Sequence, residues 1–420
     1  MALNKFPTYE ELRKNSPEVL SIVESSVGKK EILKISWYPW TWKTLVSWMM
    51  FAHCTDRPKV YLTFAHMLVA YTKQWIWVKD NIYTLDSYLY RYWEWARERG
   101  WHKSDDEWNQ ARINMINRLN PAPWTILFID EAQDISTEVV AKLSLKFDSV
   151  VICWDKDQTI YEKSNAWADF FQDYENALRR NPGFDYMLDV PDIGHLKKNY
   201  RNTPPIFEFA NCFQPDAQKI KDIQIMRKWW VKPQLWIWDE KDVLDELITF
   251  CINNIESQWI VWIIVDNKKD VPYVYEYLKN WIRHGMGSKF EEWMLCNYAS
   301  SDELTAADKK ALCDKCMNAN VIVSTIHSMK WLEFDNVVFW KIWQSSWRSY
   351  DSISRNRYYV WMTRAKDRLI ICQENEWFWN YSINSNLYDV HNVWVEEVED
   401  NWIFDDYDDD DDDEYDELPF

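Results

Sequence analysis

The chain has 420 residues, of which 47% are hydrophobic, so it is long enough for two or three domains with a sizeable core. No run of about 18 apolar residues and no signal sequence is present, which argues against a membrane or secreted protein. We therefore expect a cytoplasmic protein. The eight cysteines are scattered, which favours reduced thiols over a disulfide framework.

The net charge of −19 is unevenly distributed along the chain. From Glu396 to the end there are 15 acidic residues and no Lys or Arg, so the remaining residues carry 52 acidic and 48 basic side chains. The body of the protein is nearly balanced, which leaves room for a local basic groove. Cys313 and Cys316 form a lone CxxC pair, for which only Cys296 and His284 could be further zinc ligands, and free thiols are expected.

Glycine and tryptophan occur in unusual numbers, with 6 Gly and 30 Trp. An average chain has about 7% glycine and very little tryptophan, so the two residues look exchanged. Trp229 and Trp230 lie in a polar stretch typical of a flexible turn. Our hypothesis is that the organism reads UGA codons as glycine and that they are written here as tryptophan. Deliberate substitution and a genuinely Trp-rich protein are the alternatives.

Apolar, β-branched runs alternate with amphipathic stretches, a pattern typical of parallel sheets flanked by helices. After a helical start, the predicted strands of the first half are 31–36, 59–64, 125–130 and 149–154. Those of the second half are 259–266, 320–326, 336–340 and 368–372, in a sheet that begins near Lys232. The predicted fold class is α/β with two domains.

The first domain is predicted to span residues 1–203, with a small insertion at 88–123, and the second residues 204–395, with a small insertion at 280–320. The low-complexity acidic segment 396–420 is predicted to be a disordered tail.

A phosphate-binding pattern follows the first predicted strand. Residues 37–44 read Trp-Tyr-Pro-Trp-Thr-Trp-Lys-Thr, and glycine at the three tryptophans would complete a P-loop before a helix. Such a loop turns its backbone N–H groups onto phosphates, which needs positive φ and no side chain. With tryptophan there, we expect no ATP binding and an inactive chain. The candidate ATP-binding residues are Trp37, Trp40, Thr41, Trp42, Lys43 and Thr44, the last also a ligand of Mg²⁺.

An apolar strand that ends in two acidic residues lies 86 residues after Thr44, in Ile126-Leu-Phe-Ile-Asp130-Glu131-Ala-Gln-Asp134. This is the pattern of a Walker B element, in which Asp130 would hold Mg²⁺ and Glu131 would deprotonate the attacking water. A buried strand before an acidic helix start has the same pattern, but the upstream P-loop favours the catalytic interpretation.

Six further motifs follow in order along the chain: Lys59-Val-Tyr-Leu-Thr63-Phe-Ala-His66, Tyr83-Thr84-Leu-Asp86-Ser87, Trp154-Asp155-Lys-Asp-Gln158, Leu196-Lys-Lys-Asn199-Tyr200-Arg201-Asn202-Thr203, Ser324-Thr325-Ile-His327-Ser328-Met-Lys330-Trp331-Leu-Glu333, and Tyr359-Val-Trp361-Met-Thr363-Arg364. Together with Asp-Glu-Ala-Gln-Asp, they resemble the motif set of superfamily 1, UvrD/Rep-like helicases. The resemblance covers about four-fifths of the chain and implies two RecA-like domains.

The resemblance also implies roles for these residues at an ATP site between the domains. Gln158 would sense the γ-phosphate, Tyr200 would stack on adenine, and Glu333 would meet the ribose. Arg201 and Arg364 would reach the γ-phosphate, where a planar cation stabilises the charge of phosphoryl transfer. The residues implied to contact nucleic acid are Thr63, His66, Thr84, Thr325, His327 and Ser328.

Some positions depart from the family pattern. Asp86 replaces a histidine, and residues 1–36 contain no glutamine that could select adenine. Lys163 stands where the family has an aromatic residue, so a phosphate contact would replace base stacking. The insertions are small, and no nuclease motif is found.

The expected function is that of an ATP-dependent translocase or helicase, with ATP and Mg²⁺ as cofactors. Its expected partner is single-stranded DNA, or RNA, and the family favours 3′-to-5′ movement and a role in DNA repair. The alternatives are a nucleic-acid-stimulated ATPase that remodels protein complexes, and a catalytically dead interaction protein.

The acidic tail ends in Leu418-Pro419-Phe420. It resembles the tip of bacterial single-stranded-DNA-binding proteins, whose terminal Phe fills an apolar pocket on a partner protein. A solvating tail and a tail that competes with nucleic acid for the basic groove are the other interpretations.

Overall fold

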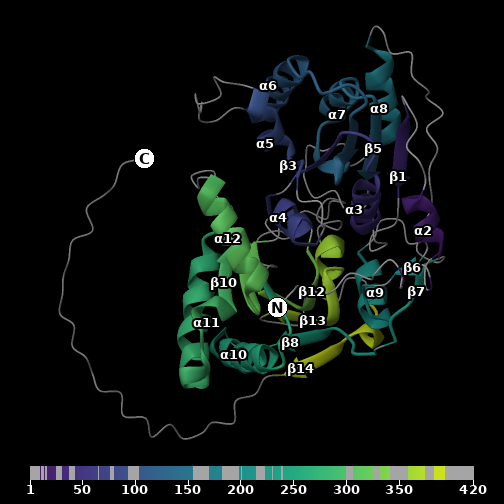
Figure 1. Ribbon diagram of the computed structural model, residues 1–420. Coiled ribbons are helices and arrows are strands. Elements are labelled where there is room, and N and C mark those ends of the chain that lie inside the picture. The colour runs from purple at the N-terminus through teal and green to yellow at the C-terminus, as the bar shows by residue number, and fades with distance from the viewer. Residues whose placement is uncertain are drawn as a thin grey trace, which may run out of the picture.

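The computed structural model describes Glu10, Lys14 and residues 17–24, 31–36, 43–64, 66–75, 80–92, 104–154, 170–181, 198–199, 201–213, 223–228, 230–237, 240–298, 306–325, 332–340, 358–373 and 383–392. Within this part of the chain the fold is α/β, with two parallel sheets flanked by helices (Figure 1). The predicted fold class is confirmed. None of the helices described here is long and apolar enough to cross a membrane.

The first sheet has five parallel strands in the order β1-β5-β4-β2-β3. Every residue of β4 is buried, as the continuous apolar run Ile-Leu-Phe-Ile leads one to expect for a parallel strand covered on both faces. The strands are β1 (Ile32–Ser36), β2 (Lys59–Thr63), β3 (Ile82–Thr84), β4 (Ile126–Ile129) and β5 (Ser149–Trp154). The accompanying helices are α2 (Pro17–Val23), α3 (Lys43–His53), α4 (His66–Trp75), α5 (Leu85–Leu89), α6 (Asp105–Asn117), α7 (Thr137–Ser144) and α8 (Phe170–Arg179).

The second sheet has seven parallel strands in the order β10-β11-β9-β12-β13-β8-β14. Its strands are β8 (Gln234–Ile237), β9 (Val261–Val265), β10 (Leu295–Tyr298), β11 (Val321–Thr325), β12 (Phe334–Trp340), β13 (Ala365–Gln373) and β14 (Asp389–Asn392). Its helices include α9 (Pro204–Asn211), α10 (Glu240–Glu256), α11 (Asp270–Met286) and α12 (Ala306–Asn318). A short parallel pair, β6 (Lys198–Asn199) and β7 (Gln224–Ile225), lies between the two sheets in the chain.

Alternate residues of each strand point to opposite faces, so each sheet divides its apolar side chains between two layers. In the first sheet, Leu33 and Ile35 join a different cluster from Ile32. In the second sheet, Trp262 and Ile264 join the same cluster as Leu33, whereas the alternating residues of β9 form a third cluster. One continuous apolar cluster therefore connects the inner faces of both sheets.

The eight predicted strands agree with the structure to within three residues at each end, and the predicted start of the second sheet near Lys232 matches β8. The two-residue strands β6 and β7 were missed, and so were three strands of the two main sheets, namely β3, β10 and β14. All three lie at sheet edges and have only three or four residues. The predicted domain boundaries stay a prediction.

Candidate functional site

The predicted P-loop lies between β1 and α3, which begins at Lys43. Residues 37–42 and the side chain of Lys43 lie outside the described part of the chain, so Trp37, Trp40, Thr41 and Trp42 stay predictions. Thr44, in the first turn of α3, is half-buried. A strand that leads directly to a helix start is the context that a phosphate loop requires.

Asp130 follows β4 directly and is 1% exposed. The Tyr61 hydroxyl donates to its Oδ2 at 2.9 Å, and Ser47 Oγ donates to the Tyr61 oxygen at 3.2 Å. Burial, followed by the neighbouring charge of Asp130, raises the pKa of Tyr61 well above its usual range, so this hydroxyl stays protonated and can donate. The bonds fix the Asp130 carboxylate relative to the helix that follows the P-loop.

Glu131 has a left-handed backbone, with φ 55° and ψ 43°, which is uncommon for a residue other than glycine. Its side chain is buried and accepts a hydrogen bond from Gln133 Nε2. The Glu131 backbone N–H donates to Asp130 Oδ1 at 3.0 Å. Strained backbone of this kind is found most often at functional sites, where surrounding contacts hold it in place.

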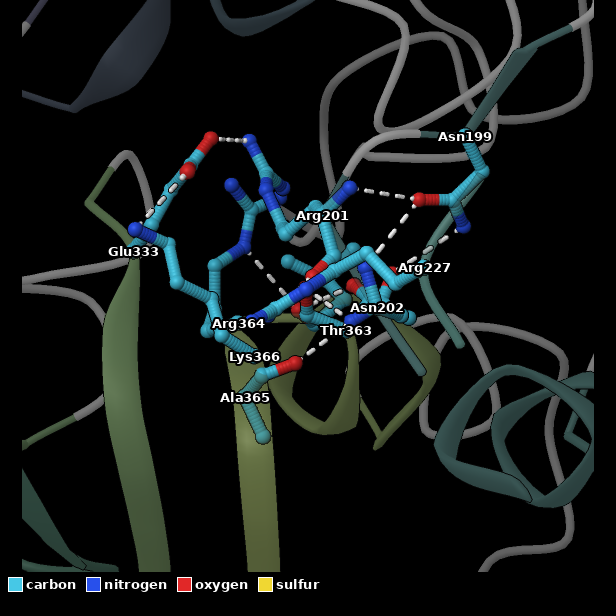
Figure 2. Close-up of polar contacts among 10 residues, drawn as sticks. Asn199, Arg201, Asn202, Arg227, Glu333, Thr363, Arg364, Ala365 and Lys366 are labelled. Carbon is cyan, nitrogen blue, oxygen red and sulfur yellow. Dashed lines mark hydrogen bonds and ion pairs between the residues drawn. The ribbon is translucent and has the colours of Figure 1, made fainter. Parts of the chain in front are cut away.

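A group of charged residues, most of them half-buried, brings together three of the predicted motifs (Figure 2). Glu333 accepts a hydrogen bond from Arg201 Nη2, and its Oε2 lies 3.6 Å from Lys366 Nζ. Burial alone would raise the pKa of Glu333, but Arg201, Lys366 and the nearby Arg364 outweigh it and lower that pKa to about 2. Glu333 is therefore ionised at neutral pH, and it holds one of the two predicted phosphate-binding arginines.

The guanidinium group of Arg201 is only partly satisfied in this arrangement. Its Nε and Nη1 are buried and have no hydrogen-bond partner among the described residues. Buried donors without partners are costly, and they are rare in folded proteins. Arg201 therefore keeps charged donors for an anionic ligand such as a phosphate group.

The backbones that carry Arg201 and Arg364 are hydrogen-bonded to each other through Asn202. Its Nδ2 donates to the carbonyl oxygens of Thr363 at 3.0 Å and Ala365 at 2.6 Å, the two residues on either side of Arg364 (Figure 2). Asn199 Oδ1 accepts the backbone N–H groups of Arg201 at 2.8 Å and Asn202 at 3.1 Å. Both arginines are therefore held on one connected unit.

Arg227 adds a second connection to this unit. Its Nη1 donates to the carbonyl oxygen of Arg201 at 3.0 Å, and its Nη2 donates to Asp367 Oδ1 at 2.7 Å. Arg364 is 3% exposed, and its Nε donates to the carbonyl oxygen of Val360 at 3.0 Å. Charge-assisted hydrogen bonds of this kind are stronger than neutral ones, so the position of the unit is well defined.

The predicted nucleic-acid residues are only partly brought together. Thr63 and Thr84 are register partners at the carboxyl ends of β2 and β3. Thr63 Oγ1 is buried without a partner among the described residues, whereas Thr84 Oγ1 caps α5 by accepting the Ser87 N–H at 3.1 Å. His66 is exposed at the start of α4, and Thr325 is buried at the end of β11.

Several predicted site residues lie outside the described part of the chain, and their roles stay predictions. These are Gln158, Lys163, Tyr200, His327 and Ser328, together with the acidic tail and its Leu418-Pro419-Phe420 tip. Asp86, the departure from the family pattern, forms a bidentate ion pair with Arg112 of α6, with both N–O distances 2.8 Å.

The cysteines of the described residues are free thiols. Cys296 Sγ and Cys316 Sγ lie 2.7 Å apart, and Cys313 Sγ lies 3.9 Å from the Tyr298 hydroxyl. Within the described residues, no group of three or more His, Cys, Asp or Glu side chains is arranged to hold a metal ion.

Two tryptophans have unusual surroundings. Trp124 has φ 69° in the left-handed region, and its side chain is 51% exposed. Trp361, three residues before Arg364, is 3% exposed, and its Nε1 has no hydrogen-bond partner among the described residues. The hypothesis that glycines are written as tryptophan stays a prediction.

Sequence reasoning missed Tyr61, Asn202, Arg227 and Lys366. Asn202 is adjacent to Arg201 in a quoted motif, and Lys366 lies two residues after Arg364, so proximity in the sequence was an available signal. No sequence pattern indicated Arg227, because it lies in a polar stretch outside the motifs. It reaches the site only because it follows β7 in the fold.

The model of the family UvrD-like helicase C-terminal domain matches residues 275–376, a range that includes Glu333 and Arg364. The predicted resemblance to UvrD/Rep-like superfamily 1 helicases is thus confirmed over residues 275–376, which are similar to a UvrD-like helicase C-terminal domain. The match supports a nucleic-acid-dependent helicase or ATPase. No curated protein matches the sequence.

Among solved structures, the C-terminal domain of a possible DNA helicase from Lactobacillus plantarum WCFS1 is 17% identical, with a TM-score of 0.32, over 46% of this chain and 98% of that one. Dbp5 of S. cerevisiae, bound to RNA and ADP BeF3, is 11% identical, with a TM-score of 0.46, over 90% of this chain and 94% of that one. The family match, rather than these overall similarities, relates the chain to helicases.

Proposed function

We propose that the chain is an ATP-dependent motor that moves along single-stranded nucleic acid, preferentially DNA and in the 3′-to-5′ direction. The observation that carries the proposal is the locked pair of arginines. Arg201 has two buried nitrogens without partners among the described residues, and Asn202 ties its backbone to that of Arg364. Such a pair suits the charge that spreads over phosphate oxygens in phosphoryl transfer.

The residues present fit ATP and Mg²⁺. Asp130 offers a buried carboxylate whose position Tyr61 fixes, and Thr44 lies at the start of the helix after the phosphate loop. Mg²⁺ bound to ATP would neutralise phosphate charge at this site. Glu131, next to Asp130, would accept the proton of an attacking water. Arg364, from the second domain, and Arg201, at the predicted domain boundary, would donate hydrogen bonds to the phosphate oxygens. Hydrolysis would then require closure of the two domains.

The test is ATP turnover by the chain with glycine at positions 37, 40 and 42, measured with and without single-stranded DNA. We expect turnover that single-stranded DNA stimulates, no turnover in Lys43→Ala, and retained ATP binding without hydrolysis in Glu131→Gln. Normal turnover in Lys43→Ala would remove the motor hypothesis. Sequencing the gene tests the glycine hypothesis, which fails if UGG encodes these tryptophans.

Strand displacement separates the alternatives. Duplexes with a 3′ or a 5′ single-stranded overhang report both unwinding and direction. Stimulated turnover without displacement of either duplex indicates an ATPase that remodels protein complexes. Absence of turnover in the glycine-restored chain indicates an interaction protein.

A further inference from the structure

Helices α4 and α12 belong to different sheets and pack against each other (Figure 1). On α4, Met67 and Leu68 are buried, whereas His66, Ala70 and Lys73 follow one another at spacings of four and three residues. Residues at this spacing share one helix face. This face is less buried than the one that carries Met67 and Leu68, and it has a basic residue at each end.

Helix α12 carries two lysines near its start. Lys309 precedes the buried Cys313 by four residues, and Lys310 precedes it by three. Both lysines therefore extend the inward-facing side of α12 by one turn toward its start. Lys315 lies on another side, with its Nζ 5.8 Å from the ring centre of Tyr275 on α11.

The basic side chains of the two helices are close enough for their charges to interact. Burial, and then the positive charges of Lys310 and Arg91, lower the pKa of Lys73. Partial burial, and then the charge of Lys309, lower the pKa of His66. Like charges from two domains thus face each other, which costs energy unless an anion lies between them.

Each of Lys73 and His66 has one acidic group among the charges that act on it. Asp80 acts on Lys73, and Asp86 acts on His66 but is already paired with Arg112. Within the described residues, neither Lys309 nor Lys310 forms an ion pair. The excess of positive charge stands out in a protein whose net charge is −19.

An aromatic ring adjoins the same basic residues. The guanidinium carbon of Arg91 lies 4.1 Å from the ring centre of Tyr83, and Lys73 Nζ lies 5.9 Å from it. Tyr83 precedes Thr84, which pairs in register with Thr63 at the end of β2. The basic residues are therefore continuous with the predicted nucleic-acid contacts.

We propose that Lys73, Arg91, Lys309 and Lys310, here called the basic cluster, bind the sugar-phosphate backbone of single-stranded nucleic acid across the α4–α12 contact. The bound backbone neutralises the repulsion between the helices and thereby favours approach of the two domains. This inference rests on the proposed function, and it assigns stimulation by nucleic acid to a specific set of charges outside the recognised motifs.

The first experiment measures binding of a fluorescent single-stranded oligonucleotide at several salt concentrations. Each lost phosphate contact lowers the slope of log affinity against log salt by about 0.7, which is about a fivefold loss of affinity near 0.1 M salt. We expect this loss in Lys73→Gln and about twice the slope change in the double variant Lys309→Gln/Lys310→Gln. Lys315→Gln, the matched control on the same helix, should bind as the unchanged chain does.

The second experiment reverses one charge in the glycine-restored chain. Lys310→Glu places a carboxylate opposite Lys73, so the helices attract each other without nucleic acid. We expect ATP turnover without nucleic acid to rise severalfold and stimulation by single-stranded DNA to fall. Lys315→Glu, which changes the net charge equally, should change neither quantity.

The outcomes separate this inference from the proposed function. If the unchanged chain binds single-stranded DNA with steep salt dependence, but the Lys73 and Lys309/Lys310 variants keep the same slope, the basic cluster is not the binding surface and the motor proposal stands. If the unchanged chain does not bind single-stranded DNA, the proposed function fails and this inference fails with it. Equal effects of the Lys310 and Lys315 variants indicate a general effect of net charge and also overturn the inference.

Discussion

Arg201 and Arg364 differ in how much of each guanidinium group the protein already uses. Arg201 meets Glu333 through Nη2, while its other two nitrogens have no partner among the described residues. Replacing either arginine by alanine in the glycine-restored chain should lower kcat for ATP by about 10³-fold, with a smaller effect on ATP affinity. Steady-state ATPase kinetics check this. Arg283→Ala, on the exposed side of α11, is the control, and a change confined to KM would contradict the assigned role.

Glu333 makes the stability of the protein depend on pH. Its pKa falls from 4.5 to about 2 on folding, so it stabilises the fold above pH 4.5 and loses this contribution as the pH falls toward 2. The lost contribution is about 3 kcal/mol. In urea unfolding at pH 6, Glu333→Gln should have a lower free energy of unfolding than the unchanged chain. This gap in unfolding free energy should close as the pH is lowered. A gap independent of pH would contradict the lowered pKa, and the exposed Glu292→Gln should show no gap.

Trp124 tests the glycine hypothesis through stability. Its carbonyl oxygen accepts a hydrogen bond from Arg57 Nε at 2.9 Å, so the turn with φ 69° is held in place. Trp124→Gly should raise the free energy of unfolding by about 1 kcal/mol, because glycine adopts this conformation without strain. Trp281→Gly is the matched control, equally exposed but within α11, and should lower it by about 1 kcal/mol. Destabilisation by both variants would show that tryptophan suits position 124.

At the scale of elements, the hydrogen bonds Ser47–Tyr61–Asp130 connect α3, β2 and β4. Tyr61→Phe should destabilise the protein by about 1–3 kcal/mol, because it removes a donor from a buried carboxylate. It should also raise the Mg²⁺ concentration that half-maximal ATP turnover requires in the glycine-restored chain. Tyr277→Phe, whose hydroxyl is 3.5 Å from Asp245 at the surface, is the control for unfolding and turnover. Equal stability of both variants would contradict the role of this connection.

The elements also show what could be predicted from the sequence. Central strands such as β4 and β9 are covered on both faces, so their apolar runs are continuous and visible in the sequence. Edge strands such as β10 and β14 are short and carry polar residues, which resemble loops. The charged motif residues were predicted from their pattern. Arg227, in contrast, acquires its role only through β7, which no local pattern indicates.

At the scale of the whole molecule, charge is distributed unevenly between a nearly neutral body and an acidic tail. This distribution predicts that the tail competes with nucleic acid for a basic groove on the body. Deleting all residues after Asp400 should raise affinity for single-stranded DNA at low salt if the tail occupies the basic groove, and high salt should remove the difference. Deleting Pro419 and Phe420 alone should abolish capture of a partner protein while leaving ATP turnover intact. Oligonucleotide binding and pull-down measure the two effects. If neither deletion has an effect, the tail serves solubility alone.

The connection through Asn202 has a consequence for timing. Because Asn202 bonds on both sides of Arg364 and adjoins Arg201, the two cations cannot arrive at a phosphate group one after the other. A half-closed molecule would present neither of them, so no intermediate arrangement would have partial activity. The rate of turnover would then report a single event, the arrival of the whole unit, and a strand stepping through the motor would advance once for each such arrival.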